Sequence, residues 1–446
     1  MNPVDFTNFN PLGIAIIGLF GVMTLLLPRK YAIVPVLVGT CYVGLGQVID
    51  VFGFHFTSMR LLMLVGFVRV VVKQEMEFIF LENKIDKALI VFVFISLVIY
   101  MILWQTQKAI IYKLGIVYNV FGLYLLCRLL VRDIDEVVGI IRLMLFATIP
   151  IALFMIFEKF TGKNLFSYFG SVRPYTMIRE GRLRCQGPFT HPILAGTFGV
   201  TFAPMFLGLW FKGEKDRILA VIGVISTTLI TFLCASSGPA IAYACFLVGV
   251  SCWYIKDHMR TVRWSILFLL IFLQLIMKSP VYSLIGRLSN ITGGTGWHRV
   301  YLIDSAIKYF GDWWMIGTRI TAHWMPYVLP IDPNNVDITN QYILVGIEGG
   351  IVSVILFLYL LVQCFSSVGS SIRYYADQSS WLEKFVWSLG VSLFTYVVSF
   401  VSVSMFDFME IYFYMLVSFI SIACVHEVKK DSENVLDSGE DRAWYN

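Results

Sequence analysis

The chain has 446 residues, of which 58% are hydrophobic and only 14% are charged, and its mean hydropathy is +0.76. Soluble domains carry about 25% charged residues, so this composition excludes a soluble enzyme, a disordered chain and a coiled coil. The net charge of +5 is small for this length, which argues against nucleic-acid binding. Apolar runs of about 20 residues recur along the chain, so we expect an all-α polytopic integral membrane protein.

About thirteen apolar stretches reach the length that a membrane crossing needs, and small shifts in their boundaries would make the number about twelve to fourteen. They form three groups, within residues 1–157, 191–277 and 341–425. In chain order they are Leu12–Leu27, Tyr31–Asp50, Thr57–Val72, Lys87–Trp104, Ile110–Leu130, Val137–Phe157, His191–Phe211, Ile218–Ala235, Ser237–Ile255, Trp264–Met277, Gln341–Phe365, Phe385–Val403 and Phe406–Val425.

Lys and Arg are concentrated in alternate loops between these stretches. One set of loops holds Arg29, Lys30, Arg128, Arg132, Lys212, Lys215, Arg217, Lys256, Arg260 and Arg263. Because basic loops tend to remain in the cytoplasm, we predict that this set is cytoplasmic. The acidic tail at residues 426–446 falls on the same side.

Two long loops, at residues 158–190 and 278–340, fall on the opposite side. The first is basic although it is predicted to be translocated, and Glu158 and Glu180 are its acidic residues. Its cations are Lys159, Lys163, Arg173, Arg179, Arg182 and Arg184. Translocated basic residues oppose the usual insertion bias, which indicates an anionic ligand at the outer leaflet.

The second long loop contains a segment with helical periodicity, Trp297–Trp314. Apolar residues recur there with Arg299, Asp304 and Lys308 among them, which predicts an amphipathic helix on the membrane surface. Prolines predict irregular structure at Pro326–Pro333. Five aromatic residues of this loop are candidates for stacking on sugars or for anchoring the loop: Trp297, Trp313, Trp314, Trp324 and Tyr327.

Four short motifs lie on the predicted outer side. They are RLRCQGPFTHPILAG (Arg182–Gly196), ASSGPAIA (Ala235–Ala242), the pair TGWHRVYLIDSAI and WWMIGTRI in the second long loop, and DITNQYILVGIEGGI (Asp337–Ile351). Their order resembles that of the bacterial O-antigen ligase and O-antigen polymerase superfamily, whose members are integral membrane glycosyltransferases that use polyprenyl-diphosphate-linked sugars. The resemblance covers Arg182 to Ile351 and the overall number of helices.

This resemblance implies a GT-C-like glycosyltransferase in the bacterial inner (cytoplasmic) membrane, with its active site on the periplasmic face. Such an enzyme would polymerise oligosaccharide repeat units of O-antigen, capsule or exopolysaccharide that are carried on polyprenyl diphosphate. Its partners would be this lipid-linked oligosaccharide, the bilayer and a chain-length regulator, without nucleic acid. The nearest alternative is a ligase that transfers the glycan to lipid A core or to protein. A second alternative is a transporter or flippase for the lipid-linked sugar.

The resemblance also implies roles for single residues. The family's arginine before the His-Pro element falls on Arg182 or Arg184, and its second arginine, in the large outer loop, falls on Arg299. The last motif is matched by Asn340, Tyr342, Glu348 and Gly350. A histidine that is the proposed base in the ligases is replaced by Thr339, which favours the polymerase. The family's Ser-Arg-Gly element is Ser236-Ser237-Gly238 in this chain.

The expected reaction requires that a diphosphate is held and that an acceptor hydroxyl loses its proton. Arginine makes bidentate contacts to phosphate, so the candidates for diphosphate binding are Arg182, Arg184, Arg299 and His191. The catalytic candidates are Asp337, Asn340 and Glu348. Asp337 is the preferred base, ahead of Asp332 and His323. The outer loops contain no DxD-like motif, so no metal or other cofactor is expected.

Each candidate also has an ordinary structural interpretation. The two arginines before the His-Pro element could contact lipid headgroups, and Arg299 could belong to the polar face of a surface helix. His191 could simply begin a helix, and Asp337 could be a turn or cap residue. Glu348 could reach the membrane surface from near a helix end.

Overall fold

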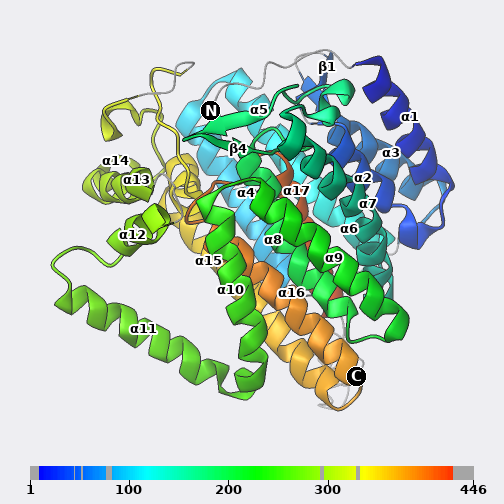
Figure 1. Cartoon of the computed structure of the whole chain (residues 1–446). Coiled ribbons are helices and arrows are strands. Elements are labelled where there is room, and N and C mark those ends of the chain that lie inside the picture. Colours follow the sequence, from blue (N-terminus) through cyan, green and yellow to red (C-terminus); the bar gives the residue numbers. More distant parts are fainter. Residues whose placement is uncertain are drawn as a thin grey trace, which may run out of the picture.

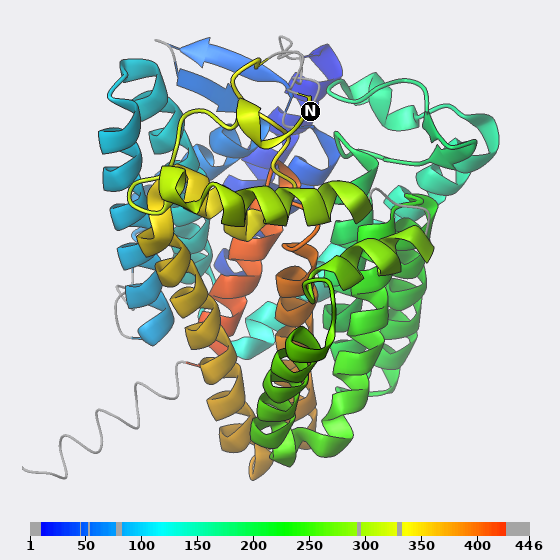
Figure 2. The same cartoon turned by 90° about the vertical axis from the view of Figure 1, so that its left-hand side faces the viewer.

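The computed structural model describes residues 10–44, 46–51, 54–76, 83–291, 296–327 and 332–424. The chain is 76% helical, and most helices stand side by side in one bundle (Figures 1 and 2). Seven described helical segments are long and apolar enough to cross a membrane: Lys84–Trp104, Gln107–Leu130, Ile134–Thr161, Pro192–Leu209, Glu214–Leu233, Ser237–Ile276 and Gln341–Ala376. Pro11–Leu26 and Phe408–Ala423 are shorter apolar helices. These features are those of an all-α polytopic membrane protein.

The helices and strands have the following bounds. The first half of the chain contains α1 (Pro11–Leu26), α2 (Val34–Tyr42), α3 (Ser58–Val72), α4 (Lys84–Trp104), α5 (Gln107–Val117), α6 (Leu123–Leu130), α7 (Ile134–Thr161), α8 (Pro192–Leu209) and α9 (Glu214–Leu233). The second half contains α10 (Ser237–Ser251), α11 (Met259–Ile276), α12 (Ser283–Ile291), α13 (Gly296–Lys308), α14 (Phe310–Trp313), α15 (Gln341–Ala376), α16 (Ser380–Ser399) and α17 (Phe408–Ala423). Two hairpins pair β1 (Val48–Val51) with β2 (Phe54–Thr57) and β3 (Met177–Arg179) with β4 (Arg182–Arg184).

All but one of the predicted membrane-spanning stretches coincide with a helix. The exception is Tyr31–Asp50, where α2 has only nine residues and the strand β1 follows it. The side chain of Gln47 accepts a hydrogen bond from the backbone N–H of Asn10 (2.7 Å) and donates one to the carbonyl oxygen of Phe169 (2.6 Å). These contacts hold the segment against the first long loop. The prediction of one continuous span was therefore wrong here.

The second long loop is also more divided than its periodicity predicts. The expected helix Trp297–Trp314 ends at Lys308, and the short α14 follows after Tyr309, whose backbone leaves the helical conformation. On α13 the buried residues follow a helical stripe, formed by His298, Arg299, Leu302, Ser305 and Ala306. This stripe faces the protein. The acidic tail at residues 426–446 and part of the segment Pro326–Pro333 lie outside the described residues.

Two glycines of the outer motifs allow two backbones to meet. Gly317 has a φ of +93°, and a Cβ there would lie 2.0 Å from the carbonyl oxygen of Ile347. Gly350 has a φ of +66° and breaks α15, and a Cβ there would lie 2.3 Å from the carbonyl oxygen of Met315. L-residues with side chains rarely adopt such φ values. Because neither glycine has a side chain, the backbone of the WWMIGTRI segment can pack directly against the backbone of the last motif.

The helix α8 forms the centre of the bundle and packs against α9, α10 and α16. Nearly every residue of α8 is buried. Gly199 lets α9 approach closely, since a Cβ on it would lie 2.6 Å from the backbone carbonyl oxygen of Thr227. On the other side, the Ser392 hydroxyl of α16 donates to the carbonyl oxygen of Thr201 (2.6 Å). The helices next to the outer motifs are thus held in fixed positions.

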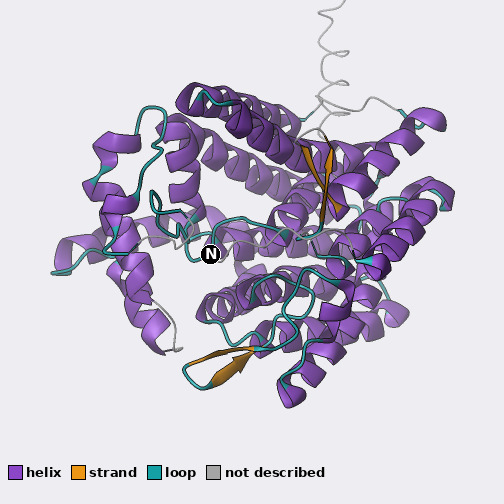
Figure 3. Ribbon diagram, turned by 90° about the horizontal axis from the view of Figure 1, so that it is seen from above, coloured by secondary structure: helices purple, strands orange, loops and turns teal. Residues whose placement is uncertain are grey.

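The two ends of the bundle differ in how their charges are compensated. At the end with the basic loops, ion pairs join neighbouring elements: Arg29 with Glu136 (2.6 Å), Lys212 with Asp135 (2.5 Å), and Lys256 with Glu383. The two long loops lie at the opposite end, where both β-hairpins also lie (Figure 3). The basic loops and the two long loops thus lie at opposite ends of the bundle, as the charge pattern predicts. Which end faces the cytoplasm stays a prediction.

We predict that Gly199→Ala destabilises the protein. The added methyl group would meet a backbone carbonyl that cannot rotate away, so α8 and α9 must separate, at a cost of about 1–3 kcal/mol. The matched control is Gly18→Ala in α1, where no atom lies within 4 Å of the added Cβ. Thermal unfolding in detergent should show a lower midpoint for the first variant alone. Equal midpoints would contradict the close packing of α8 against α9.

Candidate functional site

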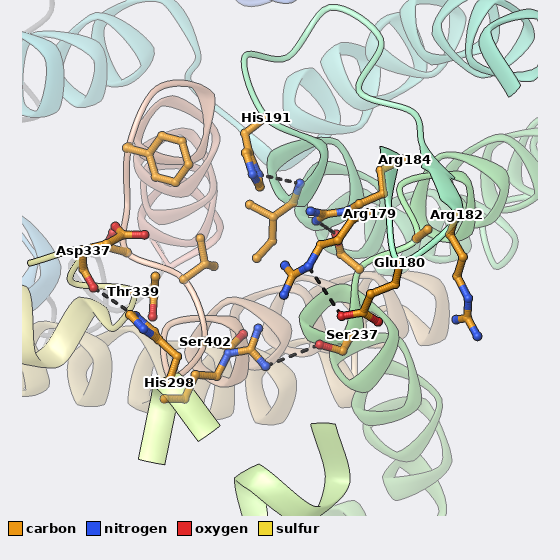
Figure 4. Close-up of a pocket in the computed structure, with 17 residues that line it drawn as sticks. Arg179, Glu180, Arg182, Arg184, His191, Ser237, His298, Asp337, Thr339 and Ser402 are labelled. Carbon is orange, nitrogen blue, oxygen red and sulfur yellow. Dashed lines mark hydrogen bonds and ion pairs between the residues drawn. The ribbon is translucent and has the colours of Figure 1, made fainter. Parts of the chain in front are cut away.

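A pocket of about 190 Å³ lies among residues of the two long loops and the adjacent helix ends, and Figure 4 shows the side chains that line it. A single water needs only about 10–15 Å³ on this measure, so an anion as large as a diphosphate has room. The pocket is lined by Arg179, Glu180, Arg182, Arg184, His191, Ile193, Ala235, Ser236, Ser237, His298, Arg299, Asp337, Thr339, Ser402, Val403, Ser404 and Phe406. Four arginines thus face two carboxylates in a site built from five separate segments.

Arg184 is the most constrained arginine of the first long loop. Its side chain is only 6% exposed, Nη2 donates to the Ser236 hydroxyl (2.5 Å), and Nη1 lies 3.9 Å from the sulfur of Met177. Its buried Nε has no hydrogen-bond partner among the described residues. Burial lowers the pKa of this guanidinium, and the nearby Arg179 acts in the same direction. A buried donor of this kind is costly unless an acceptor reaches it.

Arg299 reaches the same pocket from α13. It is also 6% exposed, and its Nη1 lies 3.5 Å from the Ser237 hydroxyl, which accepts the bond. Burial lowers its pKa to about 10, with a smaller contribution from Arg179. The adjacent Ser236 and Ser237 at the start of α10 therefore each accept a hydrogen bond from one arginine, Ser236 from Arg184 and Ser237 from Arg299. This gives a structural role to the Ser236-Ser237-Gly238 element.

The hairpin that carries Arg184 is fixed at its base. The carboxylate of Glu158, in the last turns of α7, accepts hydrogen bonds from the N–H groups of Gln186 (3.1 Å) and Gly187 (2.9 Å). The N–H of Cys185 donates to the carbonyl oxygen of Leu233 at the end of α9 (3.1 Å). Glu158 therefore organises the loop and does not neutralise the arginines of the pocket.

The remaining arginines lie at the edge of the pocket. Arg179 ends the strand β3 and Glu180 lies in the hairpin turn, and their side chains form a loose ion pair at 3.9 Å. Arg182 is exposed and lies at the margin of the group (Figure 4). These two arginines are more exposed than Arg184 and Arg299, whose guanidinium groups are held by the serine hydroxyls.

His191 caps the helix α8 and remains neutral. Its Nδ1 accepts the N–H of Ile193 (3.1 Å). Burial, together with the charges of Arg184 and Arg179, lowers the pKa of His191 to about 4. Since Nδ1 is the acceptor, the proton of the neutral ring resides on Nε2. His191 can thus act as a hydrogen-bond donor in the pocket.

The structure brings together five of the residues predicted for the site and separates two. Arg182, Arg184, Arg299, His191 and Asp337 line the pocket, whereas Asn340 and Glu348 do not. Asn340 caps α15 by accepting from the N–H groups of Tyr342 (3.0 Å) and Ile343 (3.2 Å). Glu348 lies further along α15 and forms an ion pair with Lys113 (2.6 Å).

The alternative bases are engaged elsewhere. Asp332 closes a turn with Asn334 and Asn335, and His323 lies 3.0 Å from Asp312. Within the described ranges, no three His, Cys, Asp or Glu residues gather in a way that could hold a metal ion.

Two buried polar residues were not predicted from the sequence: His298, which lines the pocket, and Asp407, which follows the lining residue Phe406 in the chain. His298 is buried beside Arg299, its Nε2 lies 3.1 Å from the backbone oxygen of Asp337, and its Nδ1 is hydrogen-bonded to the Tyr327 hydroxyl. Asp407 lies just before α17 with a φ of +56°, and its carboxyl group accepts the Thr190 hydroxyl. The sequence could not reveal either contact, because the hydrogen-bond partners of both residues are distant in the sequence and form no recognisable spacing pattern.

A comparison with protein-family models finds none that matches this chain, and a comparison with curated proteins finds no match either. The chemistry of the pocket therefore has to indicate the function. Its distinctive feature is a pair of buried arginines that are held by hydroxyl groups.

We predict that Asp407→Asn stabilises the protein at neutral and alkaline pH. Burial raises the pKa of Asp407 to about 6. A carboxyl group with a raised pKa favours the folded state while it is protonated, and this contribution is lost as the pH rises through about 6. The unfolding midpoint of the variant should exceed that of the wild type at pH 8 and equal it near pH 4. The exposed Asp257→Asn is the control, and a constant difference at all pH values would contradict the prediction.

Proposed function

We propose that the chain is a membrane glycosyltransferase that polymerises oligosaccharide repeat units carried on polyprenyl diphosphate, at the periplasmic face of a bacterial inner membrane. The observation that carries the proposal is the convergence of Arg184 and Arg299, both almost completely buried, on one pocket. The hydroxyl groups of Ser236 and Ser237 accept hydrogen bonds from these two guanidinium groups.

A diphosphate fits the charge balance of this pocket. Four arginines against two carboxylates leave an excess of positive charge, and His191 is neutral. Buried cations are stable when an anion pairs with them, and the arginine fork binds phosphate oxygens through two parallel hydrogen bonds. The unpartnered Nε of Arg184 offers one further donor.

The chemistry of transfer follows from this binding mode. An acceptor hydroxyl attacks the anomeric carbon of the donor sugar, the bond from that carbon to the phosphate oxygen breaks, and polyprenyl diphosphate leaves. Negative charge grows on the departing oxygen, where preplaced donors lower the barrier. Arg184 and Arg299 supply fixed positive charge, and His191 can supply the N–H on Nε2.

The position of the pocket suits a lipid-linked donor. The pocket lies where α8 and α10 begin, so a bound headgroup would be at the ends of apolar helices. Figure 1 shows α11 standing apart from the bundle, and none of its residues is buried within the described chain. An apolar helix that is exposed on all sides is expected in contact with lipid.

We predict that Arg184→Ala or Arg299→Ala abolishes the polymer while the protein still inserts into the membrane. Loss of one such donor is expected to reduce turnover by roughly 100-fold. The assay is a gel of surface glycan from cells that carry each variant, with an immunoblot for membrane content. The matched control is Arg260→Ala, because Arg260 is an exposed cation at the opposite end of the helix bundle.

Two outcomes of that assay, and one outcome of a separate transport measurement with the lipid-linked sugar, would count against the proposal. Normal polymer in both variants would remove the arginines from the site. A wild-type product attached to lipid A core or to protein would identify a ligase. Movement of the lipid-linked sugar across the membrane without new glycosidic bonds would identify a transporter.

We also predict that the pocket faces the periplasm. In spheroplasts, Glu180→Cys at the exposed hairpin turn should react with a membrane-impermeant maleimide, whereas Glu214→Cys at the opposite end should react only after permeabilisation. Cys245 and Cys252 are half-buried and should be changed to serine in the background, since the other six cysteines are buried. The reverse labelling pattern would place the arginines in the cytoplasm and exclude the proposed reaction.

A further inference from the structure

The two histidines of the pocket have opposite proton arrangements. The Nε2 of His298 faces the backbone oxygen of Asp337 at 3.1 Å, and a carbonyl oxygen can only accept. The proton of the neutral ring is therefore on Nε2, and Nδ1 accepts from the Tyr327 hydroxyl. In His191 the Nδ1 accepts from a backbone N–H instead. Only His298 directs a basic nitrogen toward a group that can pass on a proton.

The hydroxyl that donates to His298 belongs to an exposed aromatic pair. Tyr327 is 41% exposed, and Trp297 is 55% exposed. Their ring centroids lie 6.1 Å apart at an angle of 72°, and the His298 ring is 6.0 Å from that of Tyr327. Of the other loop tryptophans, Trp313 and Trp324 are buried and cannot present a face to a ligand. An exposed aromatic face beside a polar site suits the apolar face of a sugar ring.

The aromatic pair and the arginine hairpin belong to different sides of the site. In Figure 4, His298 and Asp337 lie on one side of the pocket, whereas Arg182 and Arg184 lie on the other. A donor whose diphosphate is held by the arginines would direct its sugar toward His298. A second sugar would then approach from the side of Trp297 and Tyr327.

We propose that Trp297, Tyr327 and His298 form the subsite for the acceptor sugar and take the proton of its attacking hydroxyl. This inference rests on the proposed function and extends it to a second binding position and a proton route. Trp297 stacks on the acceptor sugar, Tyr327 contacts the attacking hydroxyl, and His298 is the final proton acceptor. Asp337, the base expected from the sequence, contributes its backbone carbonyl and a nearby charge.

The step balances as follows. The acceptor oxygen forms a bond to the anomeric carbon, and the electron pair of the broken carbon–oxygen bond leaves with the diphosphate. The proton of the acceptor hydroxyl moves to the Tyr327 oxygen while the Tyr327 proton moves to Nδ1 of His298. Burial lowers the pKa of His298 and keeps the ring neutral beforehand, whereas the Asp337 charge favours the cation that forms.

The test uses the full chain in proteoliposomes, with lipid-linked oligosaccharides extracted from a producing strain that lacks it. His298→Gln can keep both hydrogen bonds but cannot accept a proton, and Tyr327→Phe keeps the ring. Both should lower the maximal rate by about 100-fold or more and change the half-saturating extract concentration by less than about threefold. Trp297→Ala should mainly raise that concentration. Trp264→Ala, a similarly exposed tryptophan on α11, is the control.

A rescue measurement separates proton transfer from structural support. Added imidazole should restore turnover to His298→Gly, and substituted imidazoles of lower basicity should restore less. Near-normal maximal rates in His298→Gln and Tyr327→Phe would overturn the inference. A loss in Asp337→Asn together with normal turnover in His298→Gln would assign the base to Asp337. A wild-type chain that forms no polymer from the extract would refute the proposed function, and the subsite with it.

Discussion

The structure of the pocket depends on the burial of two arginine side chains from different loops. Arg184 and Arg299 come from loops more than one hundred residues apart, and the adjacent hydroxyls of Ser236 and Ser237 receive them. A hydroxyl group satisfies a hydrogen bond but carries no charge of its own. These contacts hold both guanidinium groups in the pocket, which is the arrangement that the proposed binding of a diphosphate requires.

The rest of the fold maintains this arrangement. Glu158 closes the base of the arginine hairpin, the close contact of α8 with α9 places the start of α10, and Gly317 and Gly350 join the second long loop to the last motif. At the other end of the bundle, ion pairs join Arg29 and Lys212 of the basic loops to carboxylates of α7. Cations thus serve two purposes in one chain: at one end they connect helices, and at the other they face a pocket.

The proposed division of the pocket follows from its hydrogen bonds. A ring nitrogen that faces a carbonyl must carry a proton, and one that faces an N–H must not. These rules make His191 a donor on its free side and His298 an acceptor toward Tyr327. Two residues of the same type therefore suit opposite ends of a transfer reaction, one beside the leaving group and the other beside the nucleophile.

The sequence alone determined the membrane class, most helix positions and the basic character of the first long loop, because hydropathy and charge are local properties of a chain. It also predicted Arg184, Arg299 and His191 as site residues, Arg184 from the basic first long loop and all three from the resemblance of the short motifs, and the structure places all three in the lining of one pocket. Only the tertiary structure decided that Tyr31–Asp50 is not one span, that Asn340 is a helix cap, and that Glu348 pairs with Lys113. The roles of His298, Ser236 and Ser237 likewise depend on partners from distant segments, and such contacts exist only after the helices have packed.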